Sequence, residues 1–228
     1  MTRRYYVESL PENGGVVNLS KDEAGHAIRV MRVQIGDAIE LFDGKGYEAA
    51  ATIESVTRKE CVCISQAKLH VPRMPERVTE LAVAMPKPER AKEMVERITE
   101  LGVSKLIPII ADRTQRAPTE SVMSKLERVV IEACKQCGRN TLMQIESPIK
   151  SSDYFLQSHD GRLVIAHQGD GALSMRDLLV EPKIVAAVGP EGGWTIEEVE
   201  LAESRGFQRI SLGERIYRIE TAATVLST

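Results

Sequence analysis

Residues 183–223 read KIVAAVGPEGGWTIEEVELAESRGFQRISLGERIYRIETAA, and this stretch decides the fold. An apolar strand over 184–188 runs into a glycine-rich turn at 189–193. A helix follows, and the capping-box pair Thr195 and Glu198 marks its start. A second short strand then leads into a polar turn at 212–218. Open α/β sheets bind ligands where such turns follow neighbouring strands, so the pattern predicts a small-molecule site here.

The second half of the chain repeats a strand–helix–strand rhythm, which is the signature of a parallel α/β sheet. Apolar runs predict strands over 79–86, 106–111 and 162–167. Apolar residues at helical spacing predict helices from Glu89 to Gly102 and over 122–138. The apolar side of the longer helix is expected to include Cys137.

The first 70 residues favour antiparallel strands separated by turns. Residues 47–54 alternate between apolar and polar side chains, as a half-buried strand does. One helix is expected after Ser20, which forms a capping-box pattern with Glu23. Residues 71–78 hold two prolines among polar residues, a composition typical of a linker. We therefore predict a small β-barrel over 1–70, a linker over 71–78 and an α/β domain over 79–228.

The composition, with 43% apolar residues in a chain of 228, supports a substantial core. No run approaches the roughly 18 apolar residues that span a bilayer, and the first residues do not resemble a signal peptide, so a cytoplasmic protein is expected. The net charge of −3 argues against bulk attraction to nucleic acid, which leaves local basic patches. The four cysteines are expected to be reduced thiols. No metal site is expected, since the pairs Cys61/Cys63 and Cys134/Cys137 lack further ligands nearby in sequence.

Seven arginines are candidates for contacts with RNA. They are Arg3, Arg4, Arg29 and Arg32 on the predicted barrel, Arg113 and Arg116 in the loop after residue 111, and Arg139 after the long helix. Arg139 is expected to be exposed. The alternative reading is that they are solvated surface charges, and Arg139 could simply be a favourable charge at a helix C-terminus.

The turn at 189–193 favours a ligand that carries positive charge. Its glycines let the backbone approach a ligand closely. A phosphate site would normally carry a lysine or a G-x-G-x-x-G run, and neither is present. Glu191 in the middle of the turn also disfavours phosphate. S-adenosylmethionine, which has a sulfonium, an amine, an adenine and a ribose, fits these properties.

Three charged residues in the second turn are candidates for catalysis. Arg215 and Arg218 could hold an RNA phosphate or stabilise an anionic base, while a salt-bridged loop involving Glu220 is the alternative. His167, at the end of the 162–167 strand, could line the ligand site or cap a loop.

The ordered set of motifs resembles the RsmE family, S-adenosylmethionine-dependent methyltransferases of the SPOUT class that methylate N3 of a uridine in 16S ribosomal RNA. The two signature stretches are residues 188–193 and 212–222. Further matches cover nearly the whole chain: residues 4–7, His26-x-x-x-Val30-x-Arg32, 36–37, 42–44, 99–103, 132–133 and Gln136-x-Gly138-Arg139.

The resemblance implies a PUA-like amino-terminal barrel that helps to bind RNA and a carboxy-terminal α/β SPOUT domain with a trefoil knot around the cofactor. It also implies a homodimer that acts on the small ribosomal subunit. Arg215 and Arg218 would hold the uracil or its flanking phosphate, and Glu220 would be a base or a loop-ordering group. S-adenosylmethionine would be bound by residues at the strand ends: His167, Gly189, Glu191, Gly192, Leu212, Gly213, Ile216, Arg218 and Ala222.

Two alternatives stay open. The protein could be a SPOUT enzyme acting on another base or on a ribose 2′-hydroxyl, or a non-catalytic RNA-binding assembly factor. The sequence departs from the usual family pattern at Glu214, Tyr217, Ile219 and Cys137, and the last is expected to be a packing residue. The terminal helix of the family is usually longer, so further residues are expected beyond Thr228.

Overall fold

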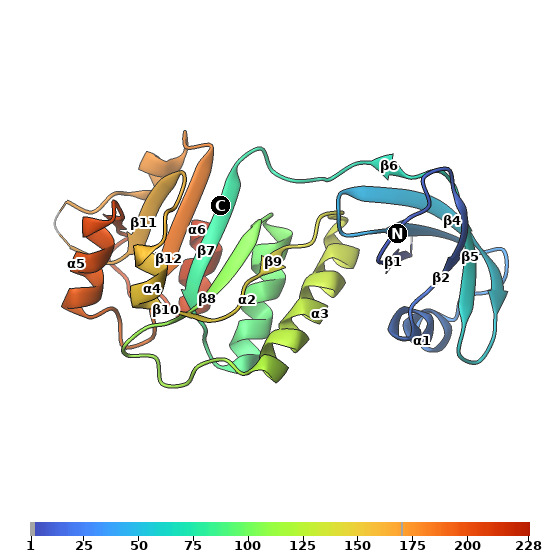
Figure 1. Cartoon of the computed structure of the whole chain (residues 1–228), viewed down its shortest axis with the longest axis horizontal. Coiled ribbons are helices and arrows are strands. Elements are labelled where there is room, and N and C mark those ends of the chain that lie inside the picture. The colour runs from blue at the N-terminus through green and yellow to red at the C-terminus, as the bar shows by residue number, and fades with distance from the viewer. Residues whose placement is uncertain (1–2, 170) are drawn as a thin grey trace. The chain divides into compact units, whose positions relative to one another are not determined.

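The structure is a computed structural model that describes residues 3–169 and 171–228 (Figure 1). Residue contacts divide the chain into two compact units. The first unit comprises Met1–Met74 and Ile131–Leu142, and the second comprises Pro75–Val130 and Met143–Thr228. The boundary between Met74 and Pro75 lies inside the predicted linker over 71–78. Residues 131–142, which were expected in the α/β domain, belong to the first unit.

A six-stranded sheet forms the first unit, with the strand order β1-β3-β4-β5-β2 and β6 paired to β4. β1 pairs with β3 in parallel, and the other pairs are antiparallel. The elements are β1 (Arg4–Tyr6), β2 (Gly15–Asn18), α1 (Lys21–Arg29), β3 (Ala38–Phe42), β4 (Tyr47–Val56), β5 (Cys61–Ser65) and β6 (Leu69–His70). The predicted alternation in β4 is confirmed, because Ala49, Ala51 and Ile53 are buried.

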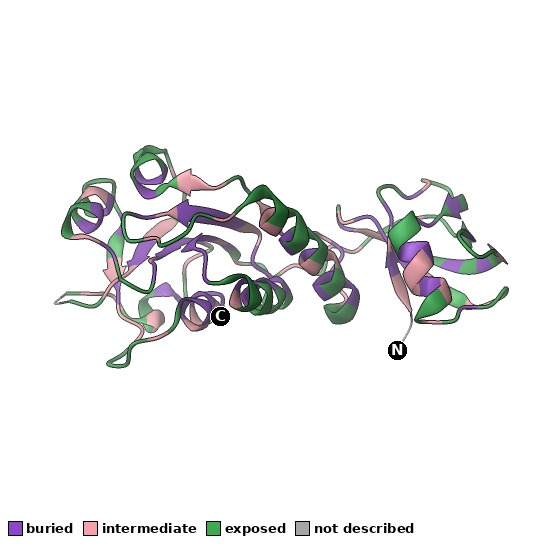
Figure 2. Cartoon of the chain, turned by 90° about the horizontal axis from the view of Figure 1, so that it is seen from below, coloured by how far each residue is buried: buried purple, intermediate pink, exposed green. Residues whose placement is uncertain are grey.

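The core of this unit consists of side chains from one face of β1, β2, β3, β4 and β5 and from the inner side of α1, where Ala24 and Ala27 are buried (Figure 2). Cys61 and Cys63 are buried thiols in the same core, and burial raises the pKa of Cys63 to about 12. Ser20 caps α1 as predicted by accepting a hydrogen bond from the Glu23 amide at 3.3 Å. The reciprocal half of the box does not form, because the Glu23 carboxylate lies 3.1 Å from Lys135 Nζ.

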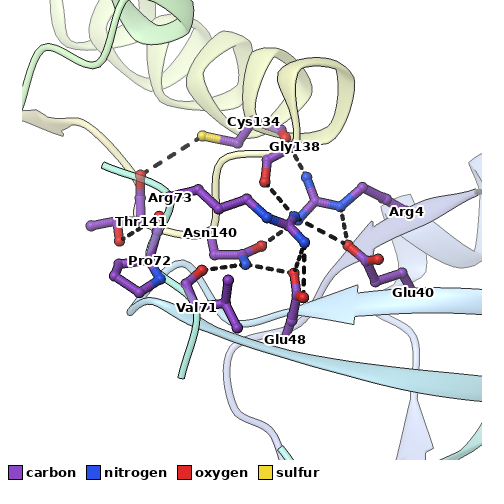
Figure 3. Close-up of polar contacts among 10 residues, drawn as sticks. All are labelled: Arg4, Glu40, Glu48, Val71, Pro72, Arg73, Cys134, Gly138, Asn140 and Thr141. Carbon is purple, nitrogen blue, oxygen red and sulfur yellow. Dashed lines mark hydrogen bonds and ion pairs between the residues drawn. The ribbon is translucent and has the colours of Figure 1, made fainter. Parts of the chain in front are cut away.

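A polar network joins β1, β3 and β4 to the last turns of α3 (Glu120–Cys137) and the loop after it (Figure 3). The Arg4 guanidinium donates to Glu40 at 2.6 Å, to the Cys134 carbonyl at 2.7 Å and to the Asn140 side chain. Asn140, which is fully buried, donates in turn to Glu48 and to the Val71 carbonyl, both at 2.6 Å. These bonds make residues 131–142 part of the first unit.

Three expectations about which side chains are exposed around this network are wrong. Arg4 is not part of an exposed basic patch, because its side chain is 8% exposed and is used by the network. Arg139 is 3% exposed, since Gly138, with a φ of +86°, turns the chain so that residues 139 and 140 face inward. Cys137 is exposed although Cys134 is buried, because three helical steps place the two side chains about 60° apart around the axis.

The second unit is a seven-stranded, wholly parallel sheet with the order β10-β8-β7-β12-β11-β13 and β9 paired to β8. Its strands are β7 (Val78–Ala84), β8 (Lys105–Ile110), β9 (Gln144–Ile145), β10 (Ile149–Lys150), β11 (Arg162–Ala166), β12 (Lys183–Val188) and β13 (Gln208–Ile210). Its helices are α2 (Pro88–Glu100), the first part of α3, α4 (Ser151–Leu156), the 3₁₀ helix η1 (Met175–Leu178), α5 (Ile196–Ser204) and α6 (Ile219–Leu226).

The predicted parallel α/β sheet is confirmed, and its central strands are buried on both faces as such strands should be. α2 and α6 pack together, with α6 against β7 and β12. α4 and α5 contribute to a separate core cluster, in which Phe155 and Val199 lie with Val185 of β12. The sequence did not predict β9, β10 or α4, which are too short to show a period.

The described residues hold no helix that is long and apolar enough to cross a membrane. They also hold no group of three or more His, Cys, Asp or Glu side chains placed to bind a metal ion.

Replacing Asn140 with Ala should lower the free energy of unfolding by about 2 to 3 kcal/mol, because it leaves buried polar atoms of Arg4 and Glu48 without one of their partners. Urea denaturation measures the change. Asn18→Ala, on an exposed position of β2, is the control and should stay within about 0.5 kcal/mol of the wild type. Equal stability of the two variants would show that the network contributes little.

Candidate functional site

A cavity of about 460 Å³ lies at the carboxyl ends of β11, β12 and β13. Because β11 pairs in parallel with both of its neighbours, the three strands end at the same edge of the sheet. The lining residues come from the segments that follow the strands. They are Ala166, His167, Gln168, Val188, Gly189, Pro190, Glu191, Gly193, Trp194, Ile210, Leu212, Arg215, Ile216, Tyr217, Arg218, Ile219 and Ala222.

The turn after β12 is shaped by its glycines and by Trp194. A Cβ on Gly189 would lie 2.9 Å from atoms of the Trp194 ring, so only glycine lets the indole pack there. Gly193 has a φ of +71°, and its amide donates to the Pro190 carbonyl at 2.8 Å. Trp194 is 5% exposed, and its buried Nε1 has no hydrogen-bond partner in the described part of the chain.

The loop after β8 fixes this turn from the side. Arg113 Nη1 donates to the Gly192 carbonyl at 2.9 Å and to the Trp194 carbonyl at 3.3 Å. The predicted capping box of Thr195 and Glu198 is confirmed, with bonds of 2.9 and 3.2 Å. The buried Glu198 carboxylate also accepts from Ser151 at 2.7 Å and from the Asp112 amide at 3.1 Å. Two segments distant in sequence therefore hold the start of α5 in place.

The turn after β13 is tied to the end of β11. Gln168 Nε2 donates to the Gly213 carbonyl at 3.0 Å and to the Arg215 carbonyl at 3.4 Å. Arg215 and Arg218 are exposed and line the cavity. The Arg215 guanidinium lies 3.4 Å from the Tyr217 hydroxyl. Two exposed cationic side chains thus line the same cavity as the carboxylate of Glu191.

His167 lines the cavity, and its amide donates to the Ile210 carbonyl at 3.2 Å. Burial, assisted by the nearby Arg209 cation, lowers the pKa of His167 below its ordinary value of 6.5. The imidazole is therefore neutral at pH 7.

The structure brings most of the predicted cofactor residues together at the cavity. His167, Gly189, Glu191, Leu212, Ile216, Arg218 and Ala222 all line it. Gly192 and Gly213 lie in the same two turns without lining it. Trp194, Gln168 and Tyr217 were missed. A lone tryptophan directly after two glycines is a signal that could have identified Trp194, whereas nothing local distinguishes Gln168.

Glu220 does not line the cavity. It is 6% exposed in the first turn of α6, and its carboxylate lies 3.7 Å from Arg90 Nε. The expectation that it acts as a base is therefore not supported, because its side chain is buried beside Arg90 and does not line the cavity. Its position fits the alternative expectation of a loop-ordering group.

The remaining arginines that were candidates for RNA contacts differ in whether their side chains already bind another part of the protein. Arg3 pairs with Asp37 at 2.5 Å, and Arg113 is bound to the turn after β12. Arg29 and Arg32 are exposed at and beyond the end of α1. Arg116 is exposed in the loop after β8.

Replacing Gly189 with Ala should lower the free energy of unfolding by about 1 to 3 kcal/mol, because the new methyl group overlaps the Trp194 ring. Gly25→Ala in α1 is the control, since its added Cβ meets the movable Arg29 side chain. That variant should be neutral or about 0.5 to 1 kcal/mol more stable. Denaturation of both variants checks the claim, and an unaffected Gly189→Ala protein would contradict the packing described.

Comparison with known proteins gives a matching pair of domains. Residues 73–228 match the family model described as an RNA methyltransferase domain, and residues 19–64 match the RNA methyltransferase PUA domain. Ribosomal RNA small subunit methyltransferase E of Rickettsia conorii is 32% identical, over 96% of this chain and 91% of that protein.

Solved structures show the same similarity over the whole chain. A methyltransferase of Legionella pneumophila, in complex with the cofactor SAM, is 32% identical with a TM-score of 0.92 and covers 100% of this chain and 96% of that one. Ribosomal RNA small subunit methyltransferase E of Neisseria gonorrhoeae, bound to S-adenosyl methionine, is 27% identical with a TM-score of 0.87 and covers 100% and 95%. The chain therefore belongs to the family of ribosomal RNA small subunit methyltransferase E, the RsmE family.

Proposed function

We propose that this protein transfers a methyl group from S-adenosylmethionine to N3 of a uridine in 16S ribosomal RNA of the small ribosomal subunit. The observation that carries the proposal is the cavity at the ends of β11, β12 and β13, where a glycine turn faces a loop with two exposed arginines. The relatives with bound S-adenosylmethionine support the cofactor, and the names of the relatives support the substrate.

The residues of the cavity fit this cofactor. The Trp194 indole lines the cavity and offers an aromatic surface to the ligand, while its Nε1 atom is itself buried. Ile210, Leu212 and Ala222 offer an apolar surface to an adenine. Glu191 supplies negative charge for a cationic ligand, and the neutral His167 adds no opposing charge. These residues would hold the cofactor.

When bound, S-adenosylmethionine supplies a methyl group on a sulfonium that leaves as a neutral thioether, so the leaving group needs no acid. The chain's own contribution is orientation, which can account for much of the rate. Uridine N3 carries a proton at neutral pH. This proton passes to solvent water beside the exposed loop after β13, and the N3–methyl bond then forms as the sulfur–methyl bond breaks. Arg215 and Arg218 stabilise the negative charge that develops on the uracil.

A homodimer and a trefoil knot are further parts of the proposal. Ile216, in the loop that lines the cavity, is 94% exposed, and a second copy of the chain would cover it. The chain from β13, at the edge of the sheet, returns to α6 against the central strands β7 and β12. This return over the strand ends is compatible with a knotted path around the cofactor.

The reaction can be tested with small ribosomal subunits that lack the modification, incubated with the protein and labelled S-adenosylmethionine. Mass spectrometry of the released nucleosides should identify N3-methyluridine. A ribose-methylated nucleoside, or a methyl group on another base, would instead identify the protein as a SPOUT enzyme with a different target atom. Failure to bind S-adenosylmethionine in calorimetry would favour a non-catalytic assembly factor.

Replacing Arg218 with Ala should lower turnover by about a hundredfold, because it removes charge stabilisation at the reacting base. Cofactor affinity should change far less. Turnover is measured by the methylation assay and affinity by calorimetry, with Arg176→Ala on the exposed η1 as the control. An equal loss of turnover and cofactor affinity would assign Arg218 to cofactor binding instead.

A further inference from the structure

A second groove, of about 730 Å³, adjoins the cavity within the second unit. Its walls are the end of β7, the start of α2, the loop after β8 and the turn after β12. The lining residues are Met85, Pro86, Lys87, Pro88, Glu89, Ala91, Thr114, Gln115, Arg116, Ala117, Pro118, Thr119, Val122, Pro190 and Glu191. Pro190 and Glu191 line both the groove and the cavity, so one turn separates the two.

The two cationic side chains of the groove form no ion pair with other described residues of the protein. Lys87 and Arg116 are exposed, and neither forms an ion pair within the described part of the chain. In contrast, Arg3, Arg4 and Arg73 all pair with carboxylates. A cation that has no internal partner keeps its charge available for a phosphate.

The groove is also preformed and polar at its mouth. Four of its lining residues are prolines, which fix their own backbone φ angle and reduce the freedom lost on binding. Gln115 is exposed, and its amide offers a donor and an acceptor, the pattern that matches the edge of an unpaired base. The volume lies within the roughly 300 to 1,000 Å³ of small-molecule sites and suits a nucleotide.

We infer that this groove receives single-stranded RNA next to the target nucleotide, with Lys87 and Arg116 on its phosphates. This inference rests on the proposed function and adds the path of the substrate. Four charged side chains line this groove, namely the cations Lys87 and Arg116 and the carboxylates Glu89 and Glu191. A second copy of the chain is disfavoured because the buried centre of a protein interface is depleted of charged residues. The two cations, which form no ion pair within the described residues, are the side chains that would contact RNA phosphates.

The test uses the double variant Lys87→Ala/Arg116→Ala. The control is Lys150→Ala/Arg176→Ala, which removes one lysine and one arginine from exposed positions that line neither the groove nor the cavity. Methylation of small ribosomal subunits lacking the modification is measured at several salt concentrations. The groove variant should raise KM for the subunits roughly tenfold. It should also reduce the slope of log KM against log salt by about 1.4, because each of two lost phosphate contacts accounts for about 0.7 of that slope. The control should keep both values.

Cofactor binding and oligomeric state are measured on the same samples, and both should be unchanged in the groove variant. A wild-type KM and salt slope in that variant would overturn the inference. So would dissociation of a dimer, which would make the groove a contact between copies. If the wild-type protein forms no N3-methyluridine, the proposed function itself is wrong, whatever the groove variant does.

Discussion

The site depends on the packing of the Trp194 indole against the backbone of Gly189. The indole fits because position 189 has no Cβ, and its ring centroid lies 5.6 Å from that of Phe155 in the core. This contact anchors the turn after β12 in the interior of the sheet. The turn in turn receives Arg113 from the loop after β8 and stands opposite the loop after β13. The cavity and the groove therefore share one wall, the turn after β12, and this turn is anchored in the core.

The sequence predicted those parts of the fold whose cause is local. The buried strand 184–188, the capping box at Thr195 and the glycine turn each need only a few neighbouring residues to be identified. Parallel pairing then brings the strand ends together, so most of the residues expected to bind the cofactor line one cavity. Gln168 was not found, since its role is a bond to a carbonyl 45 residues away.

Two of the wrong expectations concern charged side chains that the fold buries. Arg4 and Arg139 look like surface arginines in sequence, but Arg4 bonds to a segment 130 residues further along the chain. Glu220 stands in the family signature, and it lies buried beside Arg90 of α2, a position that fits a loop-ordering group. Spacing alone cannot show which charges a fold uses for its own stability. The structure shows which charged side chains have partners inside the fold. Among the exposed cations, Lys87 and Arg116 line the groove and Arg218 lines the cavity.

Trp194 is the only tryptophan in the chain, so its fluorescence reports on the site without a label. A titration with S-adenosylmethionine tests most directly whether the cavity at the ends of β11, β12 and β13 is the cofactor site. The account predicts a saturable change in Trp194 emission, with a dissociation constant that agrees with calorimetry. Binding seen by calorimetry with no change in emission would place the cofactor elsewhere and contradict the account.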